Sequence, residues 1–268
     1  MFFHFVEVFS KIAFLEEEMN RLQIQAEEFA PFVEASLKKM KISPKMKVAD
    51  IGCGTGDVCF AVSKIVGPKG SVIGVDANQT AVKYCKTVAK RRVIRNTEFV
   101  VGDAQNTQLP SHAFDAVYSR FLFQHLKNPV ACLKEMVRIA KPAGVVMVED
   151  CDLSKWVVEP ANRYVEQLWT WYEGIMKAKG SDPSIGKKLY RMFVDAGMKP
   201  QVEIYSLPVL RNNRRVWDTI LGVLTKIDDG DSRELIQGIE SFANDKNSLF
   251  VFPLVFRVWA KASRRSAS

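Results

Sequence analysis

One glycine-rich stretch, residues 47–57, limits what this chain of 268 residues can fold into. A short run with β-strand character, Lys47-Val48-Ala49-Asp50-Ile51, leads into glycines at three alternate positions, Gly52, Gly54 and Gly56. Residues 58–66 then carry apolar side chains at helical spacing. A glycine-rich turn between a strand and a helix lets a ligand lie close to bare backbone. The stretch therefore predicts a ligand site at the end of a strand.

The spacing of these glycines indicates which ligand the turn accepts. A dinucleotide-binding turn has the pattern G-x-G-x-x-G, but here the third glycine comes one position early, at Gly56, and Asp57 takes its place. An acid beside a pyrophosphate would repel it. The turn therefore favours a ligand that has no phosphates and carries positive charge.

The rest of the chain alternates between strand-like and helix-like segments. Strands are predicted at 71–75, 97–101, 114–121 and 145–150, and helices at 57–66, 79–92 and 129–140. This alternation predicts an α/β fold with a doubly wound parallel sheet, whose sites lie at the carboxyl ends of the strands. Five polar residues fall at such ends and are expected on one edge of the sheet: Asp50, Asp76, Asp103, Ser119 and Asp150.

These segments together resemble the class I S-adenosylmethionine-dependent methyltransferases, within their small-molecule group. Residues 50–57 resemble motif I, and residues 72–76 resemble the second strand, whose terminal acid holds the two ribose hydroxyls in that family. Residues 98–104 resemble the third strand and the turn that recognises adenine, and residues 114–121 resemble the fourth strand, which leads to the methyl-transfer site. The resemblance implies a Rossmann-like seven-stranded sheet with an antiparallel last strand, plus helical insertions that form a lid.

The resemblance also implies the cofactor, S-adenosyl-L-methionine, and the residues that bind it. Residues 21–25 resemble a segment that lies over the cofactor in some small-molecule methyltransferases, although an ordinary polar helix face explains them as well. The implied cofactor-binding residues are Asp50, Gly52, Cys53, Gly54, Gly56, Asp76, Ala77, Asp103, Ala104, Ser119, Arg120 and, from the earlier segment, Gln25.

The predicted domain organisation has two parts. Residues 1–45 form an N-terminal helical segment, and residues 46–268 form a methyltransferase domain with helical insertions at about 151–182 and 210–247. The first insertion is rich in aromatic side chains between Trp156 and Tyr172. Such a helix can cover the cofactor and line an acceptor pocket. Plain packing against the core explains the same stripe, and the sequence leaves both interpretations open.

Candidate catalytic residues lie after the fourth and fifth strands. Methyl transfer needs orientation more than acid or base help, so a base is required only for a protonated acceptor. His125 is the leading candidate, although it is equally explained as a cap or packing residue. Glu149, Asp150 and Asp152 are alternatives, either as a base or as partners for an amine.

The number and spacing of cysteines and histidines argue against a structural zinc site and against a disulfide framework. The five cysteines form no CxxC pair and the three histidines are scattered, so no zinc site and no disulfide framework are expected. This usage favours a reducing compartment and predicts a cytoplasmic protein. Residues 1–12 lack the pattern of a signal peptide or a membrane span. Their apolar helical face is expected to dock on the core or on another subunit, which leaves a homodimer open.

The formal net charge of +8 leaves two classes of partner to compare. A solvated basic face explains it, and so does a nucleic-acid or anionic partner. The favoured function is methyl transfer to a small-molecule acceptor, because the aromatic insertion is present and no added nucleic-acid module is recognisable. The alternative is an RNA methyltransferase, or a non-catalytic nucleic-acid-binding protein that retains the cofactor fold. Absence of an Asn-Pro-Pro-Tyr or Asp-Pro-Pro-Tyr motif after the fourth strand argues against methylation of DNA-base or glutamine amines.

Overall fold

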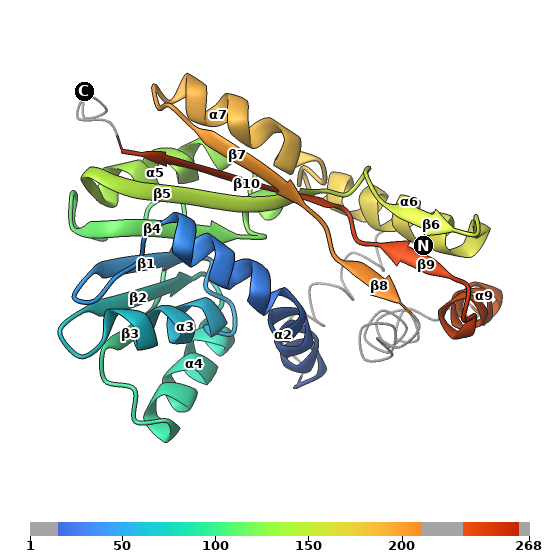
Figure 1. The fold of residues 1–268 in the computed structure, drawn as a ribbon, viewed down its shortest axis with the longest axis horizontal. Coiled ribbons are helices and arrows are strands. Elements are labelled where there is room, and N and C mark those ends of the chain that lie inside the picture. The colour runs from blue at the N-terminus through green and yellow to red at the C-terminus, as the bar shows by residue number, and fades with distance from the viewer. Residues whose placement is uncertain (1–15, 211–232, 263–268) are drawn as a thin grey trace.

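A computed structural model describes residues 16–210 and 233–262 of the chain. Its centre is a seven-stranded sheet with the strand order β3-β2-β1-β4-β5-β10-β7 (Figure 1). Neighbouring strands from β3 to β5 run parallel, and β10 runs antiparallel to both β5 and β7. The bounds are β1 (Lys47–Ile51), β2 (Ser71–Asp76), β3 (Thr97–Val101), β4 (Phe114–Arg120), β5 (Ala140–Asp152), β7 (Gln201–Tyr205) and β10 (Leu254–Lys261). The predicted Rossmann-like fold class is confirmed.

Helices cover both faces of this sheet. One face packs against α2 (Glu16–Lys39), α3 (Asp57–Val66) and α4 (Gln79–Arg91), and the other against α5 (Pro129–Ile139), η2 (Ile185–Lys188) and α7 (Leu189–Asp195). Asparagine side chains begin two of them, because Asn78 accepts from the amides of Thr80 and Ala81, and Asn128 accepts from that of Ala131. The sequence predicted α3, α4 and α5 within two residues at each end.

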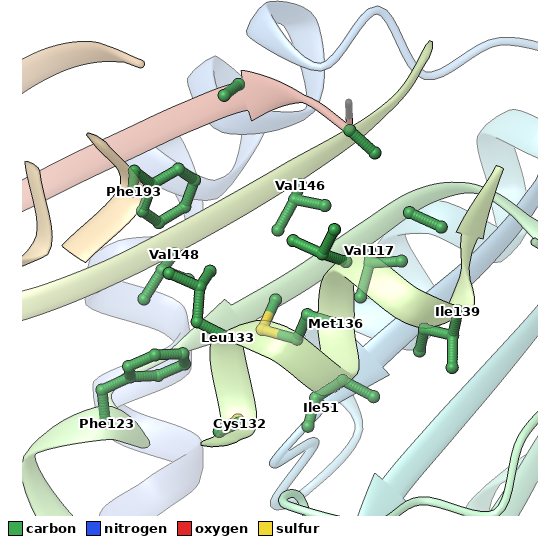
Figure 2. Packing of buried hydrophobic residues seen from close by; sticks show 14 of the residues in the cluster. Ile51, Val117, Phe123, Cys132, Leu133, Met136, Ile139, Val146, Val148 and Phe193 are labelled. Carbon is green, nitrogen blue, oxygen red and sulfur yellow. The ribbon is translucent and has the colours of Figure 1, made fainter. Parts of the chain in front are cut away.

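The α5 face shows how the layers hold together. Val117, Val146 and Val148 project from β4 and β5 against Leu133 and Met136 of α5, with Phe193 of α7 beside them (Figure 2). All six side chains are fully buried or nearly so. Burying one side chain of this size stabilises the fold by about 1.5–3 kcal/mol, so this layer fixes the strands whose carboxyl ends carry the site.

A second, smaller layer lies beyond the carboxyl ends of the parallel strands (Figure 1). It combines a three-stranded antiparallel sheet with two helices, and none of the three strands was predicted as a separate element. The members are β6 (Val157–Glu159), β8 (Pro208–Leu210), β9 (Leu249–Val251), α6 (Arg163–Ala178) and α9 (Arg233–Asn244). The antiparallel last strand that the resemblance implies is β10, and a break separates it from β9. Pro253 lies in the break, where it cannot donate a sheet hydrogen bond.

Helix α2 runs without a break through most of the described part of the predicted N-terminal helical segment. It continues through Pro31, which removes one backbone hydrogen bond and costs about 3 kcal/mol in an isolated helix. Burial of Phe29 and Val33 on either side of the proline offsets this cost. The predicted docking helix at 1–12 and most of the second insertion lie outside the described residues. The division at residue 45 stays a prediction.

A buried polar network fastens α2 to the sheet. Glu149 of β5 is fully buried and forms an ion pair with Arg257, which stands opposite it in β10. It also accepts from the hydroxyls of Ser36 and Tyr118, and Arg257 donates to the carbonyl oxygen of Phe32 at 2.8 Å. Buried charges need such partners, so the network holds the helix in one position. Within the described residues, no helix combines the length and apolar character that crossing a lipid bilayer requires.

Candidate functional site

The glycine-rich turn joins β1 to α3 and leaves one side open. Gly52, Gly54 and Gly56 all have positive φ, at 76°, 51° and 80°, a region that other residues rarely adopt. A Cβ on Gly52 or Gly56 would meet the side chains of Leu122 or Cys85 at about 3 Å. A Cβ on Gly54 would meet nothing within 4 Å. The turn thus packs tightly on both ends and presents bare backbone in its middle, as the ligand prediction requires.

Asp76 ends β2 beside this turn. Its Oδ2 accepts from the amide of Gly54 at 2.8 Å, and its Oδ1 accepts from that of Asn78 at 2.9 Å. The carboxylate is therefore held in place by both neighbouring turns. Each oxygen keeps a further lone pair, so two adjacent hydroxyls of a ribose can donate to it. Ala77 follows directly and is exposed.

Buried side chains support the turn on the side that faces the core, and they are those of Asp50, Cys53, Cys59 and Cys85. The carboxyl group of Asp50 is 3% exposed and accepts from the thiol of Cys59 at 3.3 Å. Burial raises its pKa to about 7, although the thiol hydrogen bond opposes the shift. Cys85 donates to the carbonyl oxygen of Gly54 at 3.2 Å, and Cys53 is buried within the turn. These side chains shape the turn and do not face its open side.

The ends of β3 and β4 complete the predicted edge. Asp103 follows β3 and accepts from the amide of Gln105 at 2.9 Å, while Ala104 is buried behind it. Ser119 is fully buried, and its hydroxyl donates to the carbonyl oxygen of Ile51 at 2.8 Å. Ser119 therefore lies at the expected edge but uses its side chain to join β4 to β1.

Arg120 brings a positive charge to the same edge. Its guanidinium lies 5.8 Å from the ring centre of Phe29 and 5.4 Å from that of Phe121. One of its nitrogens, Nη1, is buried and has no hydrogen-bond partner in the part of the chain that the structure describes. The nearby carboxyl of Asp50 does not form an ion pair with it. A buried donor without a partner is costly, so a ligand with a carboxylate fits this position.

Strain marks the turn that follows Arg120. Phe121 has a φ of 54°, a left-handed conformation that is unfavourable for an aromatic residue. Its amide donates to the carbonyl oxygen of Glu149 at 2.8 Å, which fixes the turn against β5. Strained residues of this kind gather at functional sites, where the surrounding structure holds them.

An aromatic cluster lies next to Arg120, and we define it as Phe29, Phe121, Trp169, Tyr172 and Phe252. Phe29 makes edge contacts with Phe121 and Phe252, at centroid distances of 5.2 and 5.4 Å. Trp169 makes edge contacts with Tyr172 and Phe252, at 6.1 and 6.3 Å. The cluster brings together α2, the end of β4, α6 and the segment before β10. Aromatic rings in such a group suit a flat apolar ligand.

The aromatic side chains of α6 and of the segment before β6 lie in two surroundings. Trp156, Tyr164 and Trp171 pack in a separate hydrophobic group with α9 and β9. The hydroxyl of Tyr164 donates to Glu234 at 2.7 Å, and its ring lies where a Cβ on Gly238 would collide. These three residues are therefore scaffold of the outer layer. Trp169 belongs to this group as well and also reaches the aromatic cluster, as Tyr172 does.

The three acids proposed as alternative bases are all engaged by the protein itself. Glu149 belongs to the buried network beneath α2. Asp150 accepts from the amides of Gln124 and Cys151, and burial raises its pKa to about 7. Asp152 accepts from Ser154 and faces Lys187 at 3.4 Å. None of the three is thus placed to take a proton from an acceptor.

His125 is placed differently from these acids. It ends the short helix η1 (Phe123–His125), directly after β4, and its side chain is exposed. The same turn is anchored by the hydrogen bond from Gln124 to Asp150. His125 therefore stands on a fixed turn at the correct edge and stays the candidate base. Gln25 lies in α2, but its side chain is outside what the structure describes.

Sequence reasoning missed several residues at this edge. Phe29 and Phe252 come from segments about 220 positions apart, and neither follows a recognisable motif. The one usable signal was their apolar character beside a proline, at Pro31 and Pro253. Tyr205, which stacks on Phe32 at 4.4 Å and donates to Glu149, was also missed.

The comparisons with known proteins agree with this geometry. Residues 42–197, more than half of the chain, match the family model described as a methyltransferase domain. An uncharacterised methyltransferase of Schizosaccharomyces pombe is 31% identical over 157 residues, which are 56% of this chain and 55% of that protein. A demethylmenaquinone methyltransferase of Bacillus cytotoxicus is 26% identical over 206 residues, which are 72% of this chain and 86% of that protein.

The solved structure of YcgJ from Bacillus subtilis has the same fold. Its TM-score is 0.60 at 18% identity, with coverage of 87% of this chain and 98% of that one. The chain spans little more than half the length of the first curated relatives it matches. The matched family segment runs from before β1 to the end of α7 and contains the glycine-rich turn, Asp76 and Arg120. The chain therefore belongs to the methyltransferase domain family, as a class I S-adenosylmethionine-dependent methyltransferase.

Proposed function

We propose that this chain transfers a methyl group from S-adenosyl-L-methionine to a small-molecule acceptor held at the aromatic cluster. The observation that carries the proposal is the juxtaposition of two features at one sheet edge. The open backbone of Gly54 and the acid Asp76 lie at the ends of β1 and β2. Arg120 and the aromatic cluster lie beside them at the end of β4.

The chain's residues fit the cofactor along this edge. The carboxylate of Asp76 accepts from the ribose hydroxyls, and the turn at Asp103 and Ala104 lies where adenine is expected. The guanidinium of Arg120 pairs with the carboxylate of the cofactor's amino-acid part, which satisfies its unpartnered Nη1. The cofactor supplies an electrophilic methyl group on a positively charged sulfur.

The aromatic cluster orients the acceptor and excludes water from it. Orientation alone can account for most of the acceleration, because attack on a methyl group requires an in-line approach. Trp169 and Tyr172 of α6 contribute the side of the cluster that comes from the outer layer. His125 takes the proton from the acceptor where the acceptor arrives protonated. The proposed partner is thus a small molecule with a flat apolar part.

The charge of this edge argues against a nucleic-acid acceptor. Two carboxyl groups that are not buried, those of Asp76 and Asp103, stand at the ends of the adjacent strands β2 and β3. They would repel a phosphate backbone. The relatives named as demethylmenaquinone methyltransferases carry names that point to a quinone-type acceptor, and such a ring matches the aromatic cluster proposed here.

The test is a screen for a methylated product. The purified chain is incubated with isotopically labelled S-adenosylmethionine and a panel of small aromatic acceptors, including demethylated quinone head groups, and products are detected by mass spectrometry. We expect a product heavier by one labelled methyl group, and none with Asp76→Ala. Label that appears in added RNA instead, or in no acceptor although the cofactor binds, would contradict the proposal.

A further inference from the structure

A groove lies on the edge of the sheet opposite the methyltransferase site. It is lined by the amino-terminal residues of β1, β2 and β3, by the end of α3, and by the loops that precede β3 and β4. The groove is remote from the glycine-rich turn, because the groove lies at the amino-terminal ends of the parallel strands and the turn lies at their carboxyl ends. The proposed cofactor and acceptor both bind at the opposite edge, so neither of them occupies this groove.

Positive charge dominates the lining of the groove. Lys47, Lys64 and Arg95 line it, against a single acid, Glu98. Within the described residues, none of the three cations forms an ion pair. Other cations at this edge do have partners, since Lys141 pairs with Asp115 at 2.6 Å. Three uncompensated cations in one groove favour an anionic ligand.

The floor of the groove contains a polar group that lacks a partner. Asn96 is held firmly, because its Nδ2 donates to the carbonyl oxygens of Ser63 and Gly67 at 3.0 and 2.9 Å. The next residue, Thr97, has a buried hydroxyl with no hydrogen-bond partner among the described residues. A hydroxyl can donate to a phosphate oxygen, so this group fits the same anion as the cations.

The rim of the groove carries a strained apolar residue. Val93 is 67% exposed and has a φ of 55°, and it is the sole β-branched residue with positive φ in the described chain. It closes α4, where its amide donates to the carbonyl oxygen of Lys90 at 3.2 Å. Glycine is the usual residue at this helix-ending position. The valine presents an exposed apolar side chain at the rim, at a conformational cost that glycine would avoid.

We propose that this groove binds a phosphorylated small molecule with an apolar ring, such as a nucleoside monophosphate. The phosphate lies among Lys47, Lys64 and Arg95 and accepts from Thr97. The apolar ring packs against Val93. The ligand is distinct from the cofactor, and the groove is separate from the methyl-transfer edge.

The test measures binding of two probes to the full chain by calorimetry. Saturating S-adenosylhomocysteine is present, so that a nucleotide cannot bind at the cofactor site. Pyrophosphate reports the charge alone, and AMP reports the charge together with a ring. Arg95→Ala should weaken both probes at least tenfold. Val93→Gly should weaken AMP at least threefold, leave pyrophosphate unchanged and raise the melting temperature.

Two controls make the outcome decisive. Lys86→Ala removes an exposed cation on α4 outside the groove and should change neither probe. Circular dichroism and affinity for S-adenosylhomocysteine check that each variant folds. Lack of AMP binding by the unmodified chain would overturn the proposal. So would equal losses in Arg95→Ala and Lys86→Ala, or a strong preference for a twelve-nucleotide oligouridine, because these indicate a general polyanion surface.

Discussion

Removing the side chain of Arg120 should weaken binding of the cofactor's amino-acid end and leave binding of its adenosine end unchanged. In the structure its Nη1 is buried without a partner among the described residues, and its guanidinium lies near the rings of Phe29 and Phe121 at the end of β4. A charge-assisted hydrogen bond to a carboxylate contributes about 1.5–3 kcal/mol. Arg120→Ala should therefore weaken S-adenosylhomocysteine about 10- to 150-fold.

The assay compares two ligands by calorimetry. 5′-Methylthioadenosine shares the adenosine part of S-adenosylhomocysteine but has no amino-acid carboxylate. Its affinity should stay the same in Arg120→Ala, and Arg120→Lys should restore part of the affinity for S-adenosylhomocysteine, since it keeps the charge. Arg91→Ala, an exposed cation at the end of α4, serves as the matched control.

The comparison can refute the reasoning directly. Equal weakening of both ligands in Arg120→Ala would show that the side chain supports the shape of the site and does not bind the carboxylate. An unchanged affinity for both would remove Arg120 from the cofactor site. In that case its partner would have to come from the acceptor, and the Michaelis constant of the acceptor would rise instead.

Three further predictions address the rest of the site. Asp76→Ala should weaken S-adenosylhomocysteine by about 2–4 kcal/mol with little change in melting temperature; calorimetry that shows no change would remove Asp76 from the site. The folded-state pKa of Asp50, about 7, lies above its unfolded value of 3.8, so folded Asp50 keeps its proton where the unfolded chain loses it. Its contribution to stability therefore falls as pH rises from about 4 to 7, and Asp50→Asn should gain about 3 kcal/mol relative to the unmodified chain between pH 5 and 8. A constant difference in urea denaturation at the two pH values would contradict this. Trp169→Ala should reduce turnover more than its loss of stability explains, whereas Tyr164→Ala should lower melting temperature and turnover in proportion; proportional losses in both variants would make α6 scaffold throughout.

The parallel half of the fold could be predicted because its signals are local. Each strand from β1 to β5 carries an apolar run bounded by turn residues, and polar side chains such as Asp50 and Asp76 lie at or near its carboxyl end. Parallel strands bring those ends to one edge of the sheet, and this does not depend on which hydrogen bonds the side chains there form. The predicted residues at that edge therefore fell in the right place even where their side chains, like that of Ser119, turned out to bond elsewhere.

The outer layer could not be predicted because its determinants are distant in sequence. The strand β9 pairs with β6 and β8, which lie about 40 to 90 residues before it, and no local pattern encodes that pairing. The ion pair of Glu149 with Arg257 likewise depends on the register of β5 against β10. Continuation of α2 through Pro31 required knowledge of what Phe29 and Val33 pack against.

The central claim is that the edge with Gly54 and Asp76 binds S-adenosylmethionine and not a dinucleotide. Calorimetry of the full chain with S-adenosylhomocysteine and with NAD tests it most directly. The account predicts binding of one S-adenosylhomocysteine per chain and no heat of binding from NAD. Binding of NAD with no response to S-adenosylhomocysteine would contradict it.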